Sequence, residues 1–494
     1  MMRNIFYIGF VLFISIQTAF AERLPNIILI MADDMGYGDV SYGGNRLAHT
    51  PNLQAMAENG VRLSRFYAAS AVCSPTRGSV MTGRHPFRYG IFHANVGALP
   101  KREVTLAEVL GSHGYQTGFF GKWHLGTLSK TKKDANRGGR EEFLDDYSPP
   151  SWHGFQTSFA TESKVPTFDP LYAPPKARRT WWDAMNNPKK EGVSFGTAYW
   201  DGEGVEAERG LSGDDSHIIM ERALGFIDAY KDKPFFAVIW FHAPHLPVVA
   251  GREDVEAIDS DNPYTKHYYG SIRAMDRAVG VLRGYLAEQG IAGNTLIWFT
   301  SDNGPEGVHE KPFPGSTSGL RAAKRSLYEG GIRVPAIVEY PAEIKAGGES
   351  HVASVTSDIL PTVLDLLGVD LPETVLDGVS ILPALRNTKR HIRRAPIGFE
   401  YADQIAFIGQ KYKLIYPNSP LSQEKTRTLR RARLDGQFPL PALGEFELYD
   451  LQNDPFETRN IASKKPYTVK KIYRQMKKWR ASVENSLEKN SFRH

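Results

Sequence analysis

Three continuous apolar segments, each ending in a polar cluster, constrain the fold of this chain more than any other feature of the sequence. The segments Asn26 to Met31, Phe235 to Phe241 and Leu296 to Thr300 consist almost entirely of apolar residues. Such runs are typical of strands that are buried on both faces of a parallel sheet. The carboxyl ends of parallel strands share one edge of the sheet, where such folds bind ligands. We therefore expect the polar residues that follow each run to lie together.

Helical signals separate these segments. A helix is predicted between Thr50-Pro51 and Asn59-Gly60, and Thr105 with Glu108 forms a capping box that starts a second helix. Further helices are predicted at 214–230 and 268–288. The alternation of strands and helices predicts an α/β fold with a doubly wound, mostly parallel central sheet that helices flank.

The 494-residue chain exceeds the size at which one core stops growing, roughly 250–300 residues. We predict a large domain at residues 22–390 and a smaller C-terminal α/β subdomain at 391–494, where short alternating segments precede a final helix.

Residues 1–21 have a basic start, an apolar stretch and a final Ala19-Phe20-Ala21, which predicts a secretory signal peptide. A membrane anchor is the alternative, although the apolar run is shorter than the roughly 20 residues that a spanning helix needs.

The sequence contains one cysteine, Cys73, and therefore no intramolecular disulfide. Together with the predicted signal peptide, this indicates export to a bacterial periplasm, with the extracellular space as the alternative. The net charge of +5 is modest and spread along the chain, so we expect no nucleic-acid partner. Nothing after residue 21 resembles a transmembrane segment, so we expect no stable insertion into a membrane. A basic helix between Lys464 and Arg480 is interpreted as a solvated face, and binding of a polyanion is the alternative.

Cys73 lies in the sequence Cys73-Ser74-Pro75-Thr76-Arg77-Gly78, just before a helix that Pro75 begins. Backbone N–H groups and the helix dipole favour an anion at such a position. The residue types alone leave two interpretations open, a thiolate nucleophile and a small buried cysteine.

The chain resembles the type I sulfatases in motifs that cover nearly all of the mature sequence. The pattern Cys73-x-Pro75-x-Arg77, followed by Met81-Thr82-Gly83-Arg84, is similar to the signature of this family. Further matching segments are Asp33 to Asp39, Gly121 to Gly126, His242 to His245, Thr300 to Gly304, Lys324 with Glu329 to Pro335, and Leu448 to Asp450. The resemblance implies an alkaline-phosphatase-like α/β fold and an arylsulfatase-like activity, the hydrolysis of a sulfate ester.

The resemblance also implies the chemistry of the site. A maturation enzyme oxidises the cysteine to formylglycine, whose hydrate offers one hydroxyl to attack sulfur and a second to expel sulfate afterwards. A divalent cation, calcium by family similarity with magnesium as the alternative, would be bound by hard oxygen donors. The predicted metal ligands are Asp33, Asp34, Cys73 in its modified form, Asp302 and Asn303.

The residues that the resemblance assigns to catalysis are Cys73, Arg77, Lys122, His124, His242 and Lys324. Arg77 and Lys122 would hold the nucleophile and neutralise charge, and His124 would assist its deprotonation or the release step. His242 and Lys324 would contact the sulfate and the leaving oxygen, with His242 as the general acid.

Residues 129–213 match no motif and are rich in Gly, Pro, Trp and charged residues, so we expect loops that face the substrate. The candidate substrate-binding residues are His245, Trp181, Trp182 and Trp200. Aromatic faces can stack on sugar rings, although a core anchor is the alternative for each tryptophan. We therefore expect two partners, a sulfated carbohydrate substrate and a formylglycine-generating enzyme.

Two other functions are compatible with the sequence. A phosphonate monoester or phosphodiester hydrolase shares the implied fold and sometimes the cysteine motif. A non-catalytic protein that binds sulfated glycans would use the basic C-terminal helix and the aromatic residues. Neither the sugar nor the position of its sulfate follows from the sequence, because a fold does not determine a substrate.

Overall fold

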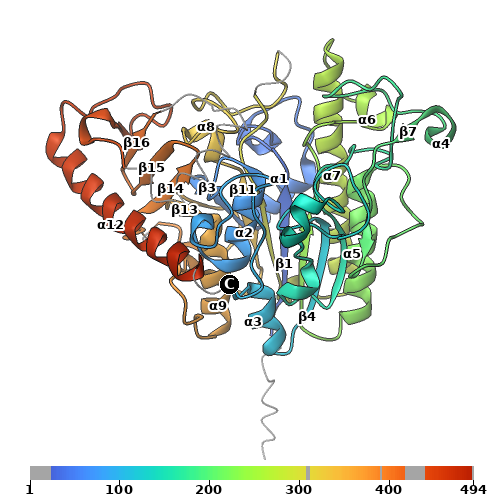
Figure 1. Ribbon diagram of the computed structural model, residues 1–494, viewed down its shortest axis with the longest axis horizontal. Helices are drawn as coiled ribbons and strands as arrows, with labels where there is room; N and C mark the ends of the chain where they lie inside the picture. Colours follow the sequence, from blue (N-terminus) through green and yellow to red (C-terminus); the bar gives the residue numbers. More distant parts are fainter. Residues whose placement is uncertain (1–23, 308–311, 390–391, 418–439, 492–494) are drawn as a thin grey trace, which may run out of the picture.

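The computed structural model describes residues 24–307, 312–389, 392–417 and 440–491 (Figure 1). The predicted signal peptide, residues 1–21, and the predicted domain boundary at 390–391 lie outside these ranges. Within them, no helix combines the length and the apolar character that crossing a membrane requires.

The apolar runs of the sequence form the centre of the main sheet. Strand β1 (Asn26–Ala32) lies between β9 (Phe235–Trp240) and β10 (Thr295–Ser301) and is parallel to both. Every residue of these strands is buried. Burial on both faces explains why the sequence shows no alternation of polar and apolar residues there.

The main sheet has nine strands in the order β12, β2, β11, β10, β1, β9, β4, β5 and β8. The strands from β10 to β5 are parallel, whereas β11 and β8 are antiparallel to their neighbours. The predicted mostly parallel sheet is therefore confirmed. The other strands of this sheet are β2 (Val61–Leu63), β4 (Gln116–Lys122), β5 (Thr157–Thr161), β8 (Trp200–Asp201), β11 (Ala336–Glu339) and β12 (Gly348–Ser350).

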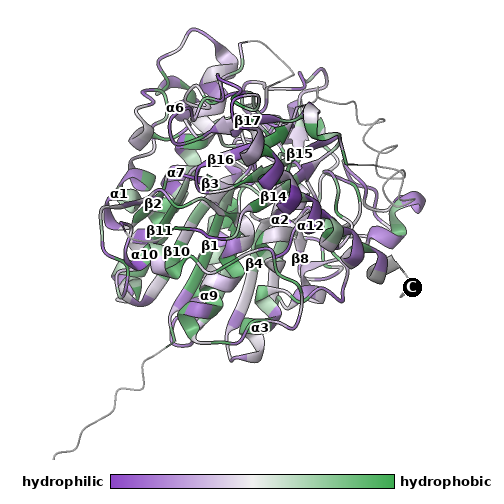
Figure 2. Cartoon of the chain, turned by 90° about the vertical axis from the view of Figure 1, so that its left-hand side faces the viewer, coloured by the Kyte–Doolittle hydropathy of each residue, from purple (hydrophilic) through white to green (hydrophobic). Residues whose placement is uncertain are grey.

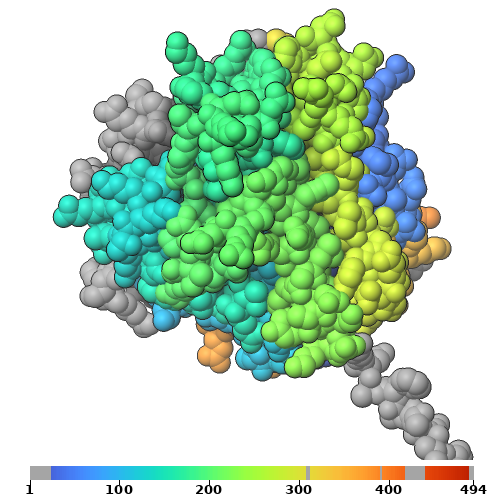
Figure 3. All heavy atoms as spheres, turned by 90° about the vertical axis from the view of Figure 1, so that its right-hand side faces the viewer, coloured from blue at the N-terminus to red at the C-terminus, as the bar shows by residue number. Residues whose placement is uncertain are grey.

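Helices cover both faces of this sheet, as predicted. The helices packed on one face are α1 (Pro51–Asn59), α5 (Asp215–Tyr230) and α7 (Pro263–Glu288). The helices packed on the other face are α2 (Cys73–Thr82), α3 (Leu106–Ser112) and α9 (Ile359–Leu367). Figure 2 shows the hydrophobic strands of the sheet in green, and Figure 3 shows the face of the molecule to which α5 and α7 belong.

The helix starts follow local capping signals. At α3, Thr105 Oγ1 accepts a hydrogen bond from Glu108 N at 3.2 Å, and Glu108 Oε2 accepts one from Thr105 N at 2.8 Å, which is the predicted capping box. Helix α7 begins at Pro263 rather than at Tyr268. Its N-cap is Asn262, which was not predicted and whose side chain accepts a hydrogen bond from Thr265 N.

Residues 129–213 are not only loops, contrary to the prediction. They contribute β5 and β8 to one end of the main sheet. Strand β5 carries three hydroxyl side chains in five residues and β8 has two residues, so neither produces an apolar run. The same stretch contains β6 (Tyr172–Ala173), β7 (Val193–Ser194) and α4 (Pro188–Glu191).

A smaller antiparallel sheet follows in the C-terminal part of the chain. Its strands are β14 (Ile397–Tyr401), β15 (Gln404–Ile408), β16 (Tyr412–Tyr416) and β17 (Glu447–Asp450). Helix α12 (Pro466–Ser491) packs on one face of it, and the other face packs on Tyr67 and Val72 of the larger unit. The predicted small α/β unit is confirmed, although β14 was not predicted.

The remaining short strands and α-helices are β3 (Phe66–Tyr67), β13 (Ser354–Val355), α6 (Arg252–Glu256), α8 (Glu329–Ile332) and α10 (Leu382–Arg386).

Candidate active site

Three carboxylates and one amide meet where β1 and β10 end. Asp33 and Asp34 follow β1 directly, and Asp302 and Asn303 follow β10. Because the two strands are parallel neighbours, their ends lie side by side, and Asp34 N donates a hydrogen bond to Asp302 Oδ1 at 3.1 Å. Asn303 Nδ2 donates to Asp34 Oδ1 at 2.7 Å. All four side chains are buried at the edge where the sequence predicts a site.

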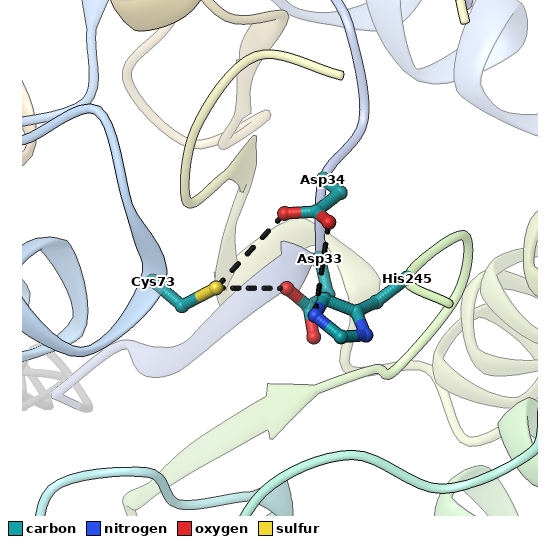
Figure 4. A group of neighbouring side chains, drawn as sticks. All are labelled: Asp33, Asp34, Cys73 and His245. Atoms are coloured by element: carbon teal, nitrogen blue, oxygen red, sulfur yellow. Dashed lines mark hydrogen bonds and ion pairs between the residues drawn. The ribbon is translucent and has the colours of Figure 1, made fainter. Parts of the chain in front are cut away.

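Cys73 is the first residue of α2 and faces these carboxylates (Figure 4). Its Sγ lies 3.4 Å from Asp33 Oδ1 and 3.9 Å from Asp34 Oδ1. The helix begins at Cys73 itself rather than at Pro75 as predicted. Burial and, next, the charge of Asp302 raise the pKa of the Cys73 thiol well above its usual value. These surroundings disfavour the thiolate nucleophile that the residue types left open.

Two buried lysines contact the carboxylates that follow β1. Lys122, the last residue of β4, contacts Asp33 Oδ2 through its Nζ. Lys324 Nζ lies 2.7 Å from Asp34 Oδ2 and 3.7 Å from Cys73 Sγ. Although burial opposes a charge on Lys324, Asp34 raises its pKa above the usual value. Lys324 is therefore a cation beside the cysteine.

Arg77 contributes a third buried cation, one helical turn after Cys73. Its Nη2 donates to Asp302 Oδ2 at 2.7 Å, and its Nη1 donates to Lys122 O at 2.9 Å. Both carboxylate oxygens of Asp302 thus have protein partners, since Oδ1 accepts from the backbone of Asp34. The predicted carboxylates and the predicted cations Arg77, Lys122 and Lys324 therefore form one connected cluster.

The cluster fits a divalent cation. Burial and the neighbouring Asp33 carboxylate raise the pKa of Asp302 to about 6, and a bound cation would relieve this repulsion. Asn303 Oδ1 is buried and has no hydrogen-bond partner among the described residues. Oxygen donors predominate, as Ca²⁺ and Mg²⁺ prefer. Among the described residues, His, Cys, Asp and Glu side chains with ligand atoms within 4.8 Å of one another are those of Asp33, Asp34, Cys73 and His245.

The two histidines that follow β9 have different surroundings. His242 is fully buried, and its Nδ1 lies 2.7 Å from Asp215 Oδ2 while its Nε2 lies 2.7 Å from Thr161 Oγ1. His245 Nε2 lies 3.8 Å from Asp34 Oδ2, and 18% of its side-chain surface is exposed (Figure 4). Both ring nitrogens of His242 are therefore engaged by protein groups, and its role as general acid stays a prediction. His245 is the histidine beside the cluster.

Sequence reasoning did not identify the two partners of His242. Asp215 lies in the first turn of α5, directly after the N-cap Asp214, where an acidic residue is common for reasons of helix stability. Thr161 is the last residue of β5, a strand that the sequence did not reveal. No local pattern marks either residue, because both contacts depend on how the strands and helices pack.

His124 lies two residues after Lys122 and is 3% exposed. Its Nε2 lies 2.7 Å from Asn95 Oδ1, whereas its Nδ1 has no hydrogen-bond partner among the described residues. Burial and, next, the charge of Lys122 hold the pKa of His124 well below its usual value. The imidazole is therefore neutral. Asn95 was not identified from the sequence, since it belongs to none of the recognised motifs.

The aromatic candidates lie mostly in the core. Trp182 and Trp200 are each 7% exposed and belong to hydrophobic clusters, so neighbouring side chains cover their rings. The structure corrects their predicted stacking role and supports the core-anchor alternative. Trp181 is partly buried and stacks on His267 with ring centroids 5.4 Å apart, while the Arg178 guanidinium lies 4.6 Å from its ring centroid.

Comparisons with known proteins agree with this geometry. The sulfatase family model matches residues 25–369. Arylsulfatase A of Bos taurus is 32% identical over 458 residues, which cover 89% of this chain and 84% of that protein. N-acetylgalactosamine-6-sulfatase of Sus scrofa is 32% identical over 391 residues, covering 75% of this chain and 68% of that protein. The crystal structure of Ps i-CgsB in complex with k-i-k-neocarrahexaose has 26% identity and a TM-score of 0.73, covering 92% of this chain and 93% of that one.

Proposed function

This chain belongs to the sulfatase family and is a sulfatase, and we propose that it removes sulfate groups from a carbohydrate. The observation that carries the proposal is the position of Cys73 Sγ, 3.4 Å from Asp33 Oδ1 and 3.7 Å from Lys324 Nζ at the start of a helix. A relative named N-acetylgalactosamine-6-sulfatase and a structural neighbour in complex with a neocarrahexaose support a sugar substrate.

In this proposal Cys73 is converted to formylglycine, which supplies a hydroxyl nucleophile that the neutral thiol lacks. Lys324 stabilises negative charge beside position 73, because its Nζ lies 3.7 Å from the sulfur that this group replaces. The first N–H groups of α2 add partial positive charge at the same point. Arg77 and Lys122 hold the surrounding carboxylates, and neutral His124 assists deprotonation of the nucleophile.

A divalent cation, calcium with magnesium as the alternative, would be held by carboxylate and amide oxygens and by the modified residue. When bound, it would draw negative charge from the sulfate oxygens. The proposed ligand Asp34 is deprotonated, because Lys324 lowers the pKa of Asp34 below the usual value although burial opposes this. The proposed ligands are Asp33, Asp34, Asp302, Asn303 and residue 73.

We propose that His245, and not His242, protonates the leaving oxygen. The Nδ1 of His245 donates to Leu246 O at 2.6 Å, which leaves Nε2 as the nitrogen that faces Asp34. Burial and the charge of Lys122 lower the pKa of His245 well below its usual value. An anionic substrate counteracts that shift and favours a proton on Nε2.

The proposal extends to export and maturation. Residues 1–21 carry the pattern of a secretory signal, which supports export to the periplasm, with the extracellular space as the alternative. A formylglycine-generating enzyme is the expected partner before or during export, since Cys73 needs oxidation to provide the hydroxyl nucleophile.

The test combines maturation with substrate turnover. The protein is produced together with a formylglycine-generating enzyme, and mass spectrometry of the peptide around position 73 reports the conversion. Sulfate release is then measured on sulfated oligosaccharides and an aryl sulfate, beside an aryl phosphodiester and a phosphonate monoester. We expect the oligosaccharides to give the highest kcat/KM.

The controls separate the competing functions. Cys73→Ala removes the nucleophile, and we expect it to abolish sulfate release without changing the circular dichroism spectrum. Faster turnover of the phosphodiester or phosphonate than of every sulfate ester would show that the proposed substrate class is wrong. Binding of a sulfated glycan by fully converted protein, with no release of sulfate from any substrate, would instead identify a non-catalytic binding protein.

A further inference from the structure

A network of partly buried hydrogen bonds connects His124 to Asn136 and Glu162. His124 Nε2 lies 2.7 Å from Asn95 Oδ1. The same oxygen lies 2.8 Å from Asn136 Nδ2, which also lies 3.0 Å from Glu162 Oε1. We propose that Asn95 is a positioning residue that holds His124 as the Nε2–H tautomer and leaves Nδ1 to accept a proton. The inference rests on the proposed function, in which His124 assists deprotonation.

The donor and acceptor roles follow from Glu162. Its Oε1 receives two further hydrogen bonds from Arg137, one from Nε at 3.1 Å and one from the backbone N at 3.3 Å. Both of these nitrogens can only donate. Glu162 Oε1 is therefore an acceptor, and the Asn136 atom that contacts it is a donor.

The orientation of the Asn136 amide determines which atom of Asn95 faces it. Its Nδ2 has two hydrogens, and it has two neighbours, Glu162 Oε1 and the side chain of Asn95. If one hydrogen goes to Glu162, the other must meet an acceptor. The Asn95 atom at 2.8 Å is therefore its carbonyl oxygen, because the flipped amide would place two NH₂ groups against each other.

His124 is the last residue of this hydrogen-bond network. Because Asn95 Oδ1 accepts, the His124 nitrogen 2.7 Å away must donate, and Nε2 carries the hydrogen. The ring is neutral, so Nδ1 has a free lone pair. This nitrogen is buried and lacks a hydrogen-bond partner in the described part of the chain. Unsatisfied buried polar atoms are rare in folded proteins, and a catalytic role is one explanation for such an atom.

The backbone is shaped for this contact. Asn95 has a φ of +61° in a turn in which Val96 N donates to His93 O at 3.2 Å. Asparagine adopts this left-handed conformation more readily than most residues. His124 has a φ of +56°, and its backbone N donates to Glu162 O at 2.8 Å. Glu162 thus contacts both ends of this hydrogen-bond network, His124 through its backbone carbonyl and Asn136 through its side chain.

Nitrogen NMR of histidine-labelled protein tests the tautomer directly. The ¹⁵N shifts of a ring distinguish protonated from unprotonated nitrogens, and the signals of His124 are identified by their loss in His124→Gln. We expect a protonated Nε2 and an unprotonated Nδ1 in the wild type. In Asn95→Gly, which tolerates the left-handed backbone but has no acceptor, we expect a mixture of tautomers. A wild-type His124 protonated on Nδ1 would overturn the inference.

Kinetics tests the consequence. We expect Asn95→Gly to lower kcat by about tenfold to a hundredfold with little change in KM, the size of effect seen when a supporting partner of an active-site group is lost. Asn95→Asp keeps an acceptor in place and should retain most of kcat. Its negative charge should move the acidic limb of the pH profile to higher pH, because it raises the pKa of His124.

Ala402→Gly is the matched backbone control, since Ala402 also has a positive φ, +52°, and has no side-chain acceptor to lose. It should retain wild-type kcat. An Asn95→Gly protein that keeps the wild-type kcat and pH profile would show that Asn95 does not position His124. If matured protein releases no sulfate while His124 is protonated on Nε2, the proposed function fails but the Asn95 contact stands.

Discussion

Lys324 Nζ lies 2.7 Å from Asp34 Oδ2 and 3.7 Å from Cys73 Sγ. One ammonium group therefore connects a proposed metal ligand with the position of the proposed nucleophile. Asp34 keeps this lysine charged, because it raises the pKa of Lys324 although burial acts in the opposite direction. The contact spans 290 positions in the sequence, and the sheet brings the two residues together.

Removal of the Lys324 charge should impair turnover. We expect Lys324→Met to lower kcat/KM for a sulfated oligosaccharide by about a hundredfold to a thousandfold, because a buried cation no longer stabilises negative charge at position 73. Sulfate release measured by ion chromatography checks this. The exposed Lys345→Met is the matched control and should retain the wild-type rate. A Lys324→Met protein with wild-type kcat/KM would contradict the assigned role.

The two histidines after β9 should give different phenotypes. His245→Gln should reduce kcat strongly for a sugar sulfate and weakly for an aryl sulfate, because a phenolic leaving group needs less help from a proton donor. His242→Gln should lower the melting temperature, since it disturbs the buried contacts with Asp215 and Thr161. Kinetics with both substrates and thermal melts of both variants provide the comparison. The same leaving-group dependence in His242→Gln would restore His242 as the general acid.

Chelation of the proposed divalent cation should abolish activity and lower the melting temperature. A ligand that binds the folded state alone at a hundred times its Kd stabilises it by about 2.7 kcal/mol. We therefore expect added Ca²⁺ to raise the melting temperature of EDTA-treated protein. The effect should be much smaller in Asn303→Ala, which lacks a proposed ligand, and unchanged in the exposed Asn187→Ala. Equal Ca²⁺ effects in all three proteins would place the cation elsewhere.

Asp39 should make stability depend on pH. Burial raises the pKa of Asp39 from 3.8 to about 6, although Tyr268, Tyr269 and two backbone N–H groups donate hydrogen bonds to it. Between these values the folded state binds more protons than the unfolded state, so this contribution to stability is present at low pH and is lost as pH rises through 6. The loss between about pH 5 and about pH 7.5 is about 1 kcal/mol.

Urea unfolding at the two pH values checks this prediction. Asp39→Asn cannot ionise, so the free energy of unfolding should change less between them than in the wild type, even if its absolute value is lower. The exposed Asp370→Asn should keep the wild-type difference. A wild-type difference that Asp39→Asn leaves untouched would assign the pH dependence to another group.

The central sheet was predictable because its strands are buried on both faces. The apolar runs that become β1, β9 and β10 stand out in the sequence, and the polar residues after them had to meet at one edge. Strands β5 and β8 at the end of the sheet were not predictable, since they are short and β5 is rich in hydroxyl side chains. Their absence from the prediction also hid Thr161, the partner of His242.

The amino-acid sequence was enough to predict the sulfatase family, the central α/β sheet, and the positions of Asp33, Asp34, Cys73 and Asp302 around one site, because strand burial and local motifs are visible in residue order. The packing of strands and helices was needed to show which of His242 and His245 lies beside Asp34 and which nitrogen of His124 lacks a hydrogen-bond partner among the described residues. Those outcomes depend on contacts between separate segments, such as His242 with Thr161, 81 positions apart, and such contacts leave no periodicity in a single sequence.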